Sequence, residues 1–234
     1  MGDSPAVSAP HTHHLRVERT ARYYTLGAEN ASVREIWFVL HGYGQLAGSF
    51  VRFFADVAKE NALVVAPEAL NRFYLVSPDH APARDRPVGA TWMTREDRES
   101  EISDYVEYLD ALCDEITSTR HVPVNVLGFS QGAATATRWV LHGRSTIERL
   151  VLWGGTMPPE TDLARAAGRL AAPVTLVAGT RDQYISDEIV AAEQARLDKA
   201  GIASEVIRFD GGHVVSRSVF PRLLGGPISD ASDL

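Results

Sequence analysis

Short runs of consecutive apolar residues recur along the chain, and most of them are separated by segments in which apolar residues return every three or four positions. The runs have the length of buried strands and cover residues 35–40, 62–66, 122–129, 150–153, 173–178 and 205–209. The helical spacing covers residues 50–58, 102–116, 131–142 and 185–200. In residues 15–26 apolar and polar positions roughly alternate, which predicts one or two edge strands.

Strands that alternate with helices predict an α/β fold with a mostly parallel central sheet and helices on both faces. The absence of a second pattern or of an internal repeat predicts one domain over residues 15–234, preceded by a Ser-, Pro-, Ala- and His-rich tail at residues 1–14. Residues 71–95 and 156–172 interrupt the alternation. Connections of that length are usually functional or carry a small helix.

Composition narrows the choice of partners. Of the 234 residues 45% are hydrophobic and 23% charged, as in globular proteins, and the net charge of −7 argues against nucleic acid or an anionic membrane as the main partner. No apolar run is long enough for stable membrane insertion, and the start of the chain lacks the features of a secretory leader, so we expect a cytoplasmic protein. Cys113 is the only cysteine, which excludes an internal disulfide, and its apolar neighbours predict a place in a helix core.

The clearest chemical motif joins the strand at 122–129 to the helix at 131–142. Residues 128–132 read Gly-Phe-Ser-Gln-Gly, a G-x-S-x-G sequence between a strand and a helix. Such a turn holds its serine in a strained conformation and exposes the hydroxyl, while the helix N-terminus points N–H groups at developing negative charge. The pattern predicts Ser130 as a nucleophile.

A serine nucleophile needs a base, which is normally a histidine. Only His142 and His213 follow Ser130 in the chain. His142 falls in the last turn of the helix after the nucleophile, far from the carboxyl end of the sheet, where it suits a helix cap. His213 follows the last strand directly, and we therefore predict it to be the base.

The base in turn needs a carboxylate to orient it. Asp182 follows the strand at 173–178, and in this architecture the chain order is serine, acid, histidine. Asp210 lies close to His213 in sequence and is the rival choice. Asp187 and Glu188 open the next helix, where carboxylates are favoured in any case. We predict Asp182 as the acid.

Acyl transfer at a serine also needs two N–H donors for the oxyanion. The main-chain N–H of Gln131 follows the nucleophile and supplies the first. The strand at 35–40 ends in His-Gly-Tyr-Gly-Gln at residues 41–45, and we predict the N–H of Tyr43 as the second donor. The alternative is that these glycines only mark a tight turn.

Together, the loop at 41–45, the Ser130 elbow, a later aspartate and a final Gly-Gly-His resemble the α/β-hydrolase superfamily. More narrowly, they are similar to the phospholipase/carboxylesterase family, which includes acyl-protein thioesterases, over roughly residues 33–220. The resemblance implies hydrolysis of carboxylic esters or thioesters by a triad of Ser130, Asp182 and His213, without a cofactor.

The family carries an aromatic residue near its acyl site, and the sequence Ala-Thr-Trp-Met at residues 90–93 resembles that segment. This assigns Trp92 and Met93 to a substrate pocket, with a place in the core as the alternative for Trp92, and Tyr184 is a further candidate for that pocket. Gln45 stands where the family often has an acidic residue, and the segment around Asp182 lacks the usual His-Gly and Val-Pro neighbours. These differences leave open which acyl group the substrate carries.

The expected activity is that of a serine esterase acting on a small-molecule ester, with thioesters and lysophospholipids included. The alternatives are a peptidase or lactone hydrolase on the same fold, a non-catalytic small-molecule receptor, and a purely structural binding protein. The chain contains no complete G-x-G-x-x-G, no phosphate-binding G-x-x-x-x-G-K-[ST] and no H-E-x-x-H, so neither a nucleotide cofactor nor a catalytic metal is predicted. The oligomeric state is left open.

Overall fold

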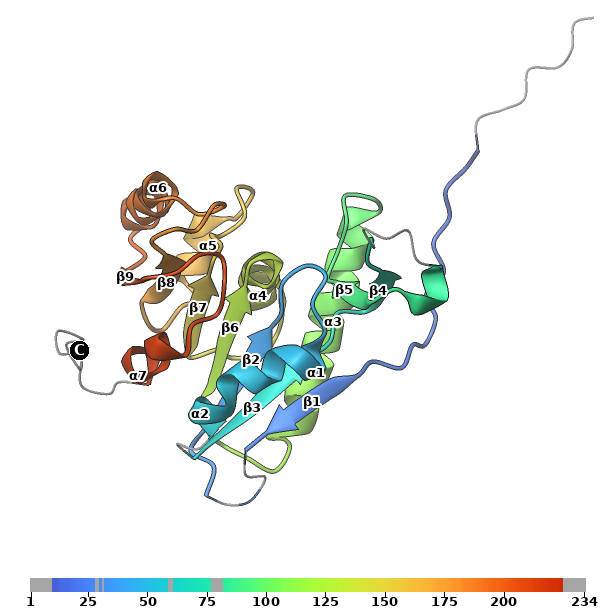
Figure 1. Ribbon diagram of the computed structural model, residues 1–234, viewed down its shortest axis with the longest axis horizontal. Coiled ribbons are helices and arrows are strands. Elements are labelled where there is room, and N and C mark those ends of the chain that lie inside the picture. Colours follow the sequence, from blue (N-terminus) through green and yellow to red (C-terminus); the bar gives the residue numbers. More distant parts are fainter. Residues whose placement is uncertain (1–9, 28–29, 31, 59–60, 77–81, 225–234) are drawn as a thin grey trace, which may run out of the picture.

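The computed structural model describes residues 10–27, 30, 32–58, 61–76 and 82–224. Its centre is a seven-stranded sheet with the order β1-β3-β2-β6-β7-β8-β9, parallel except for β1, which pairs with β3 in the antiparallel direction (Figure 1). The strands are β1 (Tyr23–Leu26), β2 (Glu35–Leu40), β3 (Ala62–Pro67), β6 (Val124–Phe129), β7 (Arg149–Trp153), β8 (Val174–Gly179) and β9 (Ser204–Phe209).

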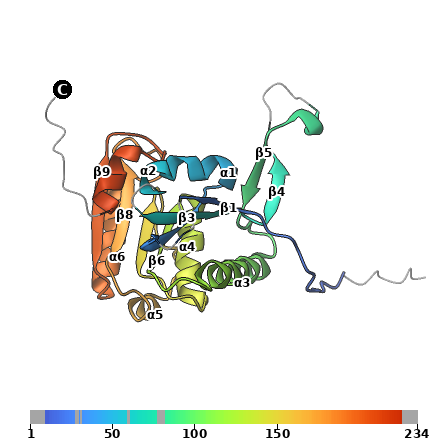
Figure 2. The same ribbon diagram turned by 90° about the horizontal axis from the view of Figure 1, so that it is seen from below.

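Helices cover both faces of this sheet (Figure 2). One face packs against α3 (Arg98–Thr117), α4 (Gln131–His142), α5 (Leu163–Ala167) and α6 (Asp187–Lys199). The other face packs against α1 (Ala47–Phe50), α2 (Ala55–Ala58) and α7 (Phe220–Leu223). The predicted single α/β domain with a mostly parallel sheet is confirmed.

The pleat of β2 shows how the two cores arise from one strand. Ile36, Phe38 and Leu40 point into the core with α3 and α4, while Trp37 and Val39 point into the core with α1 and α2. All five side chains are buried. A strand buried on both faces needs an unbroken apolar run, which is why the sequence pattern identified it.

Two predicted elements differ in detail. The helix expected at 50–58 begins earlier, at Ala47, and tightens into a 3₁₀ turn over Val51–Phe54 between α1 and α2. Of the strand or strands expected at 15–26, only β1 forms. The residues from 10 to 22 carry no secondary structure, and Arg16 ties them to Glu107 of α3 through two hydrogen bonds of 2.6 and 2.7 Å. Residues 1–9 of the expected tail lie outside the described residues.

Both interruptions of the alternation carry small elements of their own. Residues 156–172 contain α5, and residues 71–95 contain the antiparallel pair β4 (Asn71–Tyr74) and β5 (Val88–Thr91). This β4–β5 hairpin stands out from the main sheet (Figure 2). Among the described residues, no helix is long and apolar enough to cross a membrane.

Asp110 of α3 joins this helix to α4 on one face of the sheet. Its carboxylate accepts hydrogen bonds from Trp139 Nε1 of α4 (2.9 Å) and from the main-chain N–H groups of Arg144 (2.8 Å) and Ser145 (3.1 Å). The Ser145 hydroxyl adds a bond of 2.6 Å. Burial by itself would raise the pKa of Asp110, but these hydrogen bonds outweigh it and hold the pKa below its usual value.

We expect Asp110→Ala to lower the free energy of unfolding by about 3 kcal/mol at neutral pH, because it leaves several buried donors unpaired. A group with a lowered folded-state pKa stabilises the fold above its unfolded-state pKa of about 3.9, and that contribution is lost as the pH falls through the folded-state value. The difference between the variant and the wild type should therefore shrink below about pH 4.

Denaturant unfolding monitored across this pH range measures both effects. Asp104→Ala is the matched control, since Asp104 is an exposed carboxylate on the same helix. An Asp110→Ala variant as stable as Asp104→Ala at neutral pH would contradict the anchoring role.

Candidate active site

Ser130 lies in the turn between β6 and α4, with φ of 55° and ψ of −117°. A positive φ is unfavourable for a residue with a side chain, so the surroundings must impose it. Helix α4 passes so close to β6 that a Cβ atom on Gly128 would lie 2.1 Å from the carbonyl oxygen of Gly132. The Ser130 N–H donates to the carbonyl of Trp153 on β7 at 2.8 Å. The predicted strained elbow is therefore present, and both motif glycines serve its close packing.

Asp182 and His213 meet at the carboxyl ends of β8 and β9. Asp182 Oδ2 lies 2.8 Å from His213 Nδ1, and the Asp182 side chain is only 1% exposed. The other carboxylate oxygen accepts the main-chain N–H groups of Tyr184 (2.8 Å) and Ile185 (3.1 Å). These bonds fix the carboxylate, and the carboxylate fixes the imidazole ring.

The rival residues face elsewhere. Asp210 forms an exposed ion pair with Arg181, and Asp187 pairs with Arg208. Glu188 lies in the first turn of α6, and His142 is exposed in the last turn of α4. Of the carboxylates weighed from the sequence, Asp182 is the one that contacts His213.

Two aromatic rings and one glycine enclose His213. The ring of Phe129, the residue before Ser130, lies 4.9 Å from the imidazole centroid, and the ring of Tyr184 lies 4.8 Å from it. Gly154 follows β7 with φ of 58°, and a Cβ atom there would lie 2.9 Å from His213 Cε1. Gly154 is not among the residues predicted from the sequence, although a Gly-Gly pair directly after a buried strand is a usable signal.

The loop after β2 packs against the nucleophile. A Cβ atom on Gly42 would lie 3.2 Å from Ser130 Cβ. The N–H of Gly42 donates to Gln45 Oε1 (2.8 Å), and that of Gly44 donates to the carbonyl of Ala90 (2.8 Å). Since both neighbours are engaged, Tyr43 is the residue of this turn whose N–H is available as an oxyanion donor.

His41 holds this loop in place through hydrogen bonds of its ring nitrogens. It is fully buried, its Nε2 accepts the N–H of Ala69 (3.1 Å), and its Nδ1–H accordingly donates to the carbonyl of Gly42 (2.8 Å). Burial lowers the pKa of His41, although the bond to Gly42 acts in the opposite direction. His41 is therefore held as a neutral ring with a defined tautomer.

The three residues assigned to the substrate pocket lie in different surroundings. Trp92 is 1% exposed, and its Nε1 donates to the carbonyl of His41 at 2.8 Å, so it belongs to the core beneath the loop at 41–45 and does not line an open pocket. Met93 is half-buried beside Arg138. Tyr184 is 62% exposed next to His213, and Tyr43 is 60% exposed with its ring 5.1 Å from that of Phe73 on β4. The exposed aromatic surface at the candidate site thus comes from Tyr43 and Tyr184.

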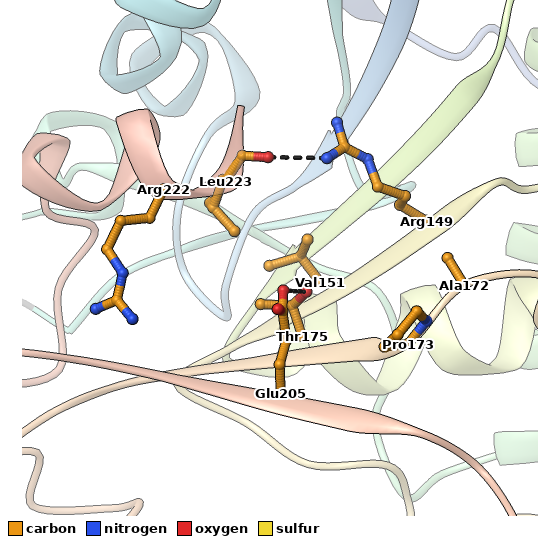
Figure 3. A pocket seen from close by; sticks show the side chains of 8 residues that line it. All are labelled: Arg149, Val151, Ala172, Pro173, Thr175, Glu205, Arg222 and Leu223. Carbon is orange, nitrogen blue, oxygen red and sulfur yellow. Dashed lines mark hydrogen bonds between the residues drawn. The ribbon is translucent and has the colours of Figure 1, made fainter. Parts of the chain in front are cut away.

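A separate cavity of about 140 Å³ lies at the amino ends of β7, β8 and β9 (Figure 3). Arg149 donates to the carbonyl of Leu223 across it (2.8 Å), and Thr175 donates to Glu205 (2.6 Å). Ser130, Asp182 and His213 all follow the carboxyl ends of their strands. The cavity therefore lies at the opposite edge of the sheet and is not part of the candidate site.

A family model described as "Serine hydrolase (FSH1)" matches residues 35–219. This range contains every residue of the candidate site. Among curated proteins no significant match is found.

Solved structures share the fold at low sequence identity. The esterase PE8 is 21% identical with a TM-score of 0.64, and the alignment covers 88% of this chain and 99% of that one. A carboxylesterase from Mesorhizobium loti is 23% identical with a TM-score of 0.64, covering 88% and 95%. The acyl-protein thioesterase 2 of Zea mays is 17% identical with a TM-score of 0.63, covering 88% and 97%.

Proposed function

Because the chain belongs to the FSH1 family of serine hydrolases, we propose that it hydrolyses carboxylic esters of small molecules through an acyl-enzyme on Ser130. The observation that carries this proposal is the 2.8 Å contact between Asp182 and His213, with the His213 ring against Phe129, the residue before Ser130, whose φ is 55°. A serine on a strained elbow beside a carboxylate-oriented imidazole is the arrangement that acyl transfer requires.

In the first step His213 accepts the hydroxyl proton while Ser130 Oγ attacks the ester carbonyl. Because Nδ1 of the imidazole faces Asp182, Nε2 is the nitrogen that takes this proton. The carbonyl oxygen becomes an oxyanion and binds the main-chain N–H groups of Tyr43 and Gln131. Collapse of the tetrahedral intermediate breaks the ester bond, and His213 returns the proton to the departing alcohol.

In the second step water attacks the acyl group on Ser130, and His213 takes a proton from that water. The same two N–H groups stabilise the second tetrahedral intermediate. Its collapse releases the carboxylic acid and returns the proton to Ser130 Oγ. The Asp182 carboxylate stabilises the imidazolium in both steps, because its negative charge lies 2.8 Å from Nδ1, and the main-chain N–H groups on its other oxygen hold it in that position.

The surroundings of the site support an ester with apolar groups. Tyr43, Tyr184 and Val214 are exposed around it, and Tyr74 and Val88 are exposed on the β4–β5 hairpin. The structurally similar proteins include a carboxylesterase and an acyl-protein thioesterase, so thioesters and lysophospholipids belong in the same substrate panel. Peptides and lactones in that panel test the alternative hydrolase chemistries.

Ser130→Ala should lower kcat for a p-nitrophenyl ester by roughly 10³- to 10⁶-fold without changing the unfolding temperature. A fluorophosphonate should label the wild type once, at Ser130, and should not label the variant. Ser118→Ala, at the end of α3, is the matched control and should keep full activity. Normal turnover by Ser130→Ala would remove this residue from the mechanism.

Asp182→Asn should lower kcat by about 10⁴-fold, because the amide can hold the imidazole in the wrong tautomer. Asp210→Asn makes the same chemical change in an exposed carboxylate that pairs with Arg181, and kcat should then change by no more than a few-fold. Steady-state kinetics of the two purified variants decides between the carboxylates. A large loss that followed Asp210 would overturn the assignment of the acid.

Tyr43→Phe should keep most of the activity, because the main-chain donor and the ring contact with Phe73 are both retained. Tyr43→Pro deletes the N–H and should raise the activation free energy by about 2.7–4 kcal/mol. The test compares kcat for the two variants. Their unfolding temperatures show whether the proline has disrupted the loop. Equally mild effects would place the second oxyanion donor elsewhere.

A further inference from the structure

The side chain of Gln131 makes a set of contacts that the proposed mechanism does not use. Its Nε2 donates to Thr91 Oγ1 (2.9 Å) and to the carbonyl of Met93 (2.9 Å). Its Oε1 accepts the main-chain N–H of Trp92 at 3.1 Å. The amide of the residue that follows the nucleophile is thus bound to three consecutive residues at the end of β5.

The loop that carries Tyr43 is bound to the same strand. The N–H of Gly44 donates to the carbonyl of Ala90 (2.8 Å), and the N–H of Ala90 donates to the carbonyl of Gln45 (3.1 Å). The loop therefore meets β5 at a single antiparallel bridge between Gln45 and Ala90, beside the β4–β5 hairpin. Gly89 packs against this loop so closely that a Cβ atom there would lie 2.4 Å from the carbonyl oxygen of Gly44.

The segments that carry the two candidate oxyanion donors are therefore attached to neighbouring residues at the end of β5 and directly after it. Tyr43 is held through Ala90, and Gln131 is held through Thr91, Trp92 and Met93. Consecutive residues of a strand keep a nearly constant spacing of about 3.3 Å. We propose that the side-chain amide of Gln131 is a positioning group that keeps the two donors at the separation an oxyanion requires, with β5 as the rigid element between them. This inference rests on the proposed function.

A carboxamide suits this role because it can donate two hydrogen bonds and accept others from one planar group. Methionine has a similar length but offers no such donors, and its main-chain N–H is unchanged. Gln131→Met therefore removes the side-chain hydrogen bonds to residues 91–93 and keeps the main-chain N–H donor of residue 131. Catalytic donors gain their effect from being fixed before the charge develops, so a loosened donor weakens transition-state binding more than substrate binding.

We expect Gln131→Met to lower kcat by about 10- to 100-fold while KM changes by less than about two-fold. A trifluoromethyl ketone forms a tetrahedral adduct with an active serine and places its oxygen in the oxyanion hole. Its inhibition constant should rise by a factor close to the loss in kcat. A merely structural role for Gln131 would change the unfolding temperature without this matched pair of kinetic effects.

Two further variants complete the test. Gln194→Met makes the same chemical change on α6, away from the site, and should leave kcat unchanged. Thr91→Val removes the hydroxyl that Gln131 contacts and should lower kcat in the same direction by a smaller factor. In the double variant the two losses should not multiply, because both changes break the same connection.

Measuring ester turnover by the wild type first distinguishes a failure of the proposed function from a failure of this inference. If the wild type shows no Ser130-dependent ester turnover, the proposed function fails and this inference falls with it. If the wild type is active and folded Gln131→Met keeps its kcat within two-fold, or loses only substrate affinity, the inference alone is wrong. If Gln131→Met does not fold, Thr91→Val decides, and an unchanged kcat and inhibition constant there would overturn the proposal.

Discussion

Ser130 holds its strained backbone conformation, with a positive φ, where α4 and β6 approach each other at glycine contacts, and the rest of the site is arranged around that turn. The strand β6 is the central one of the seven, so its carboxyl end has neighbours on both sides. On one side β7 accepts the Ser130 N–H through Trp153, and on the other side the loop after β2 reaches the serine through Gly42. Parallel strands bring these ends to one edge of the sheet, which is where open α/β sheets place their ligand sites.

The two halves of the site are built by different means. Asp182 and His213 come from the last two parallel strands, and they are joined by a direct side-chain contact. The N–H groups of Tyr43 and Gln131 are part of the main chain, so their positions depend on how loops are held rather than on rotamers. That task falls to the β4–β5 hairpin, which lies outside the main sheet.

Buried polar residues hold the loops on the oxyanion side. His41 uses both ring nitrogens within the protein, and Glu68, at the end of β3, receives hydrogen bonds from Arg22 and Arg72. Burial alone would raise the pKa of Glu68, but these arginines outweigh it and lower the pKa. His41 favours one loop arrangement over others, because breaking either of its two bonds would leave a buried ring nitrogen without a partner.

The sequence by itself determined the order of strands and helices, the elbow at Ser130, and the choice of Asp182, His213 and Tyr43 as candidates. These rest on local signals: apolar runs, helical periodicity, and a motif whose geometry is set within five residues. The mostly parallel sheet with helices on both faces also followed from the alternation, whereas the order of the strands within it comes from the structure.

Only the tertiary structure decided that Asp182 rather than Asp210 contacts His213, that Trp92 lies beneath the loop at 41–45, and that the long connection at 71–95 forms a hairpin. The bonds from the Gln131 side chain to residues 91–93 belong to the same group. Each of these depends on a contact between residues far apart in the chain. Such contacts produce no periodic pattern in the sequence of either segment. A single hydrogen bond or ring contact constrains the residue type at one position only, whereas a buried face constrains every second or every third to fourth residue.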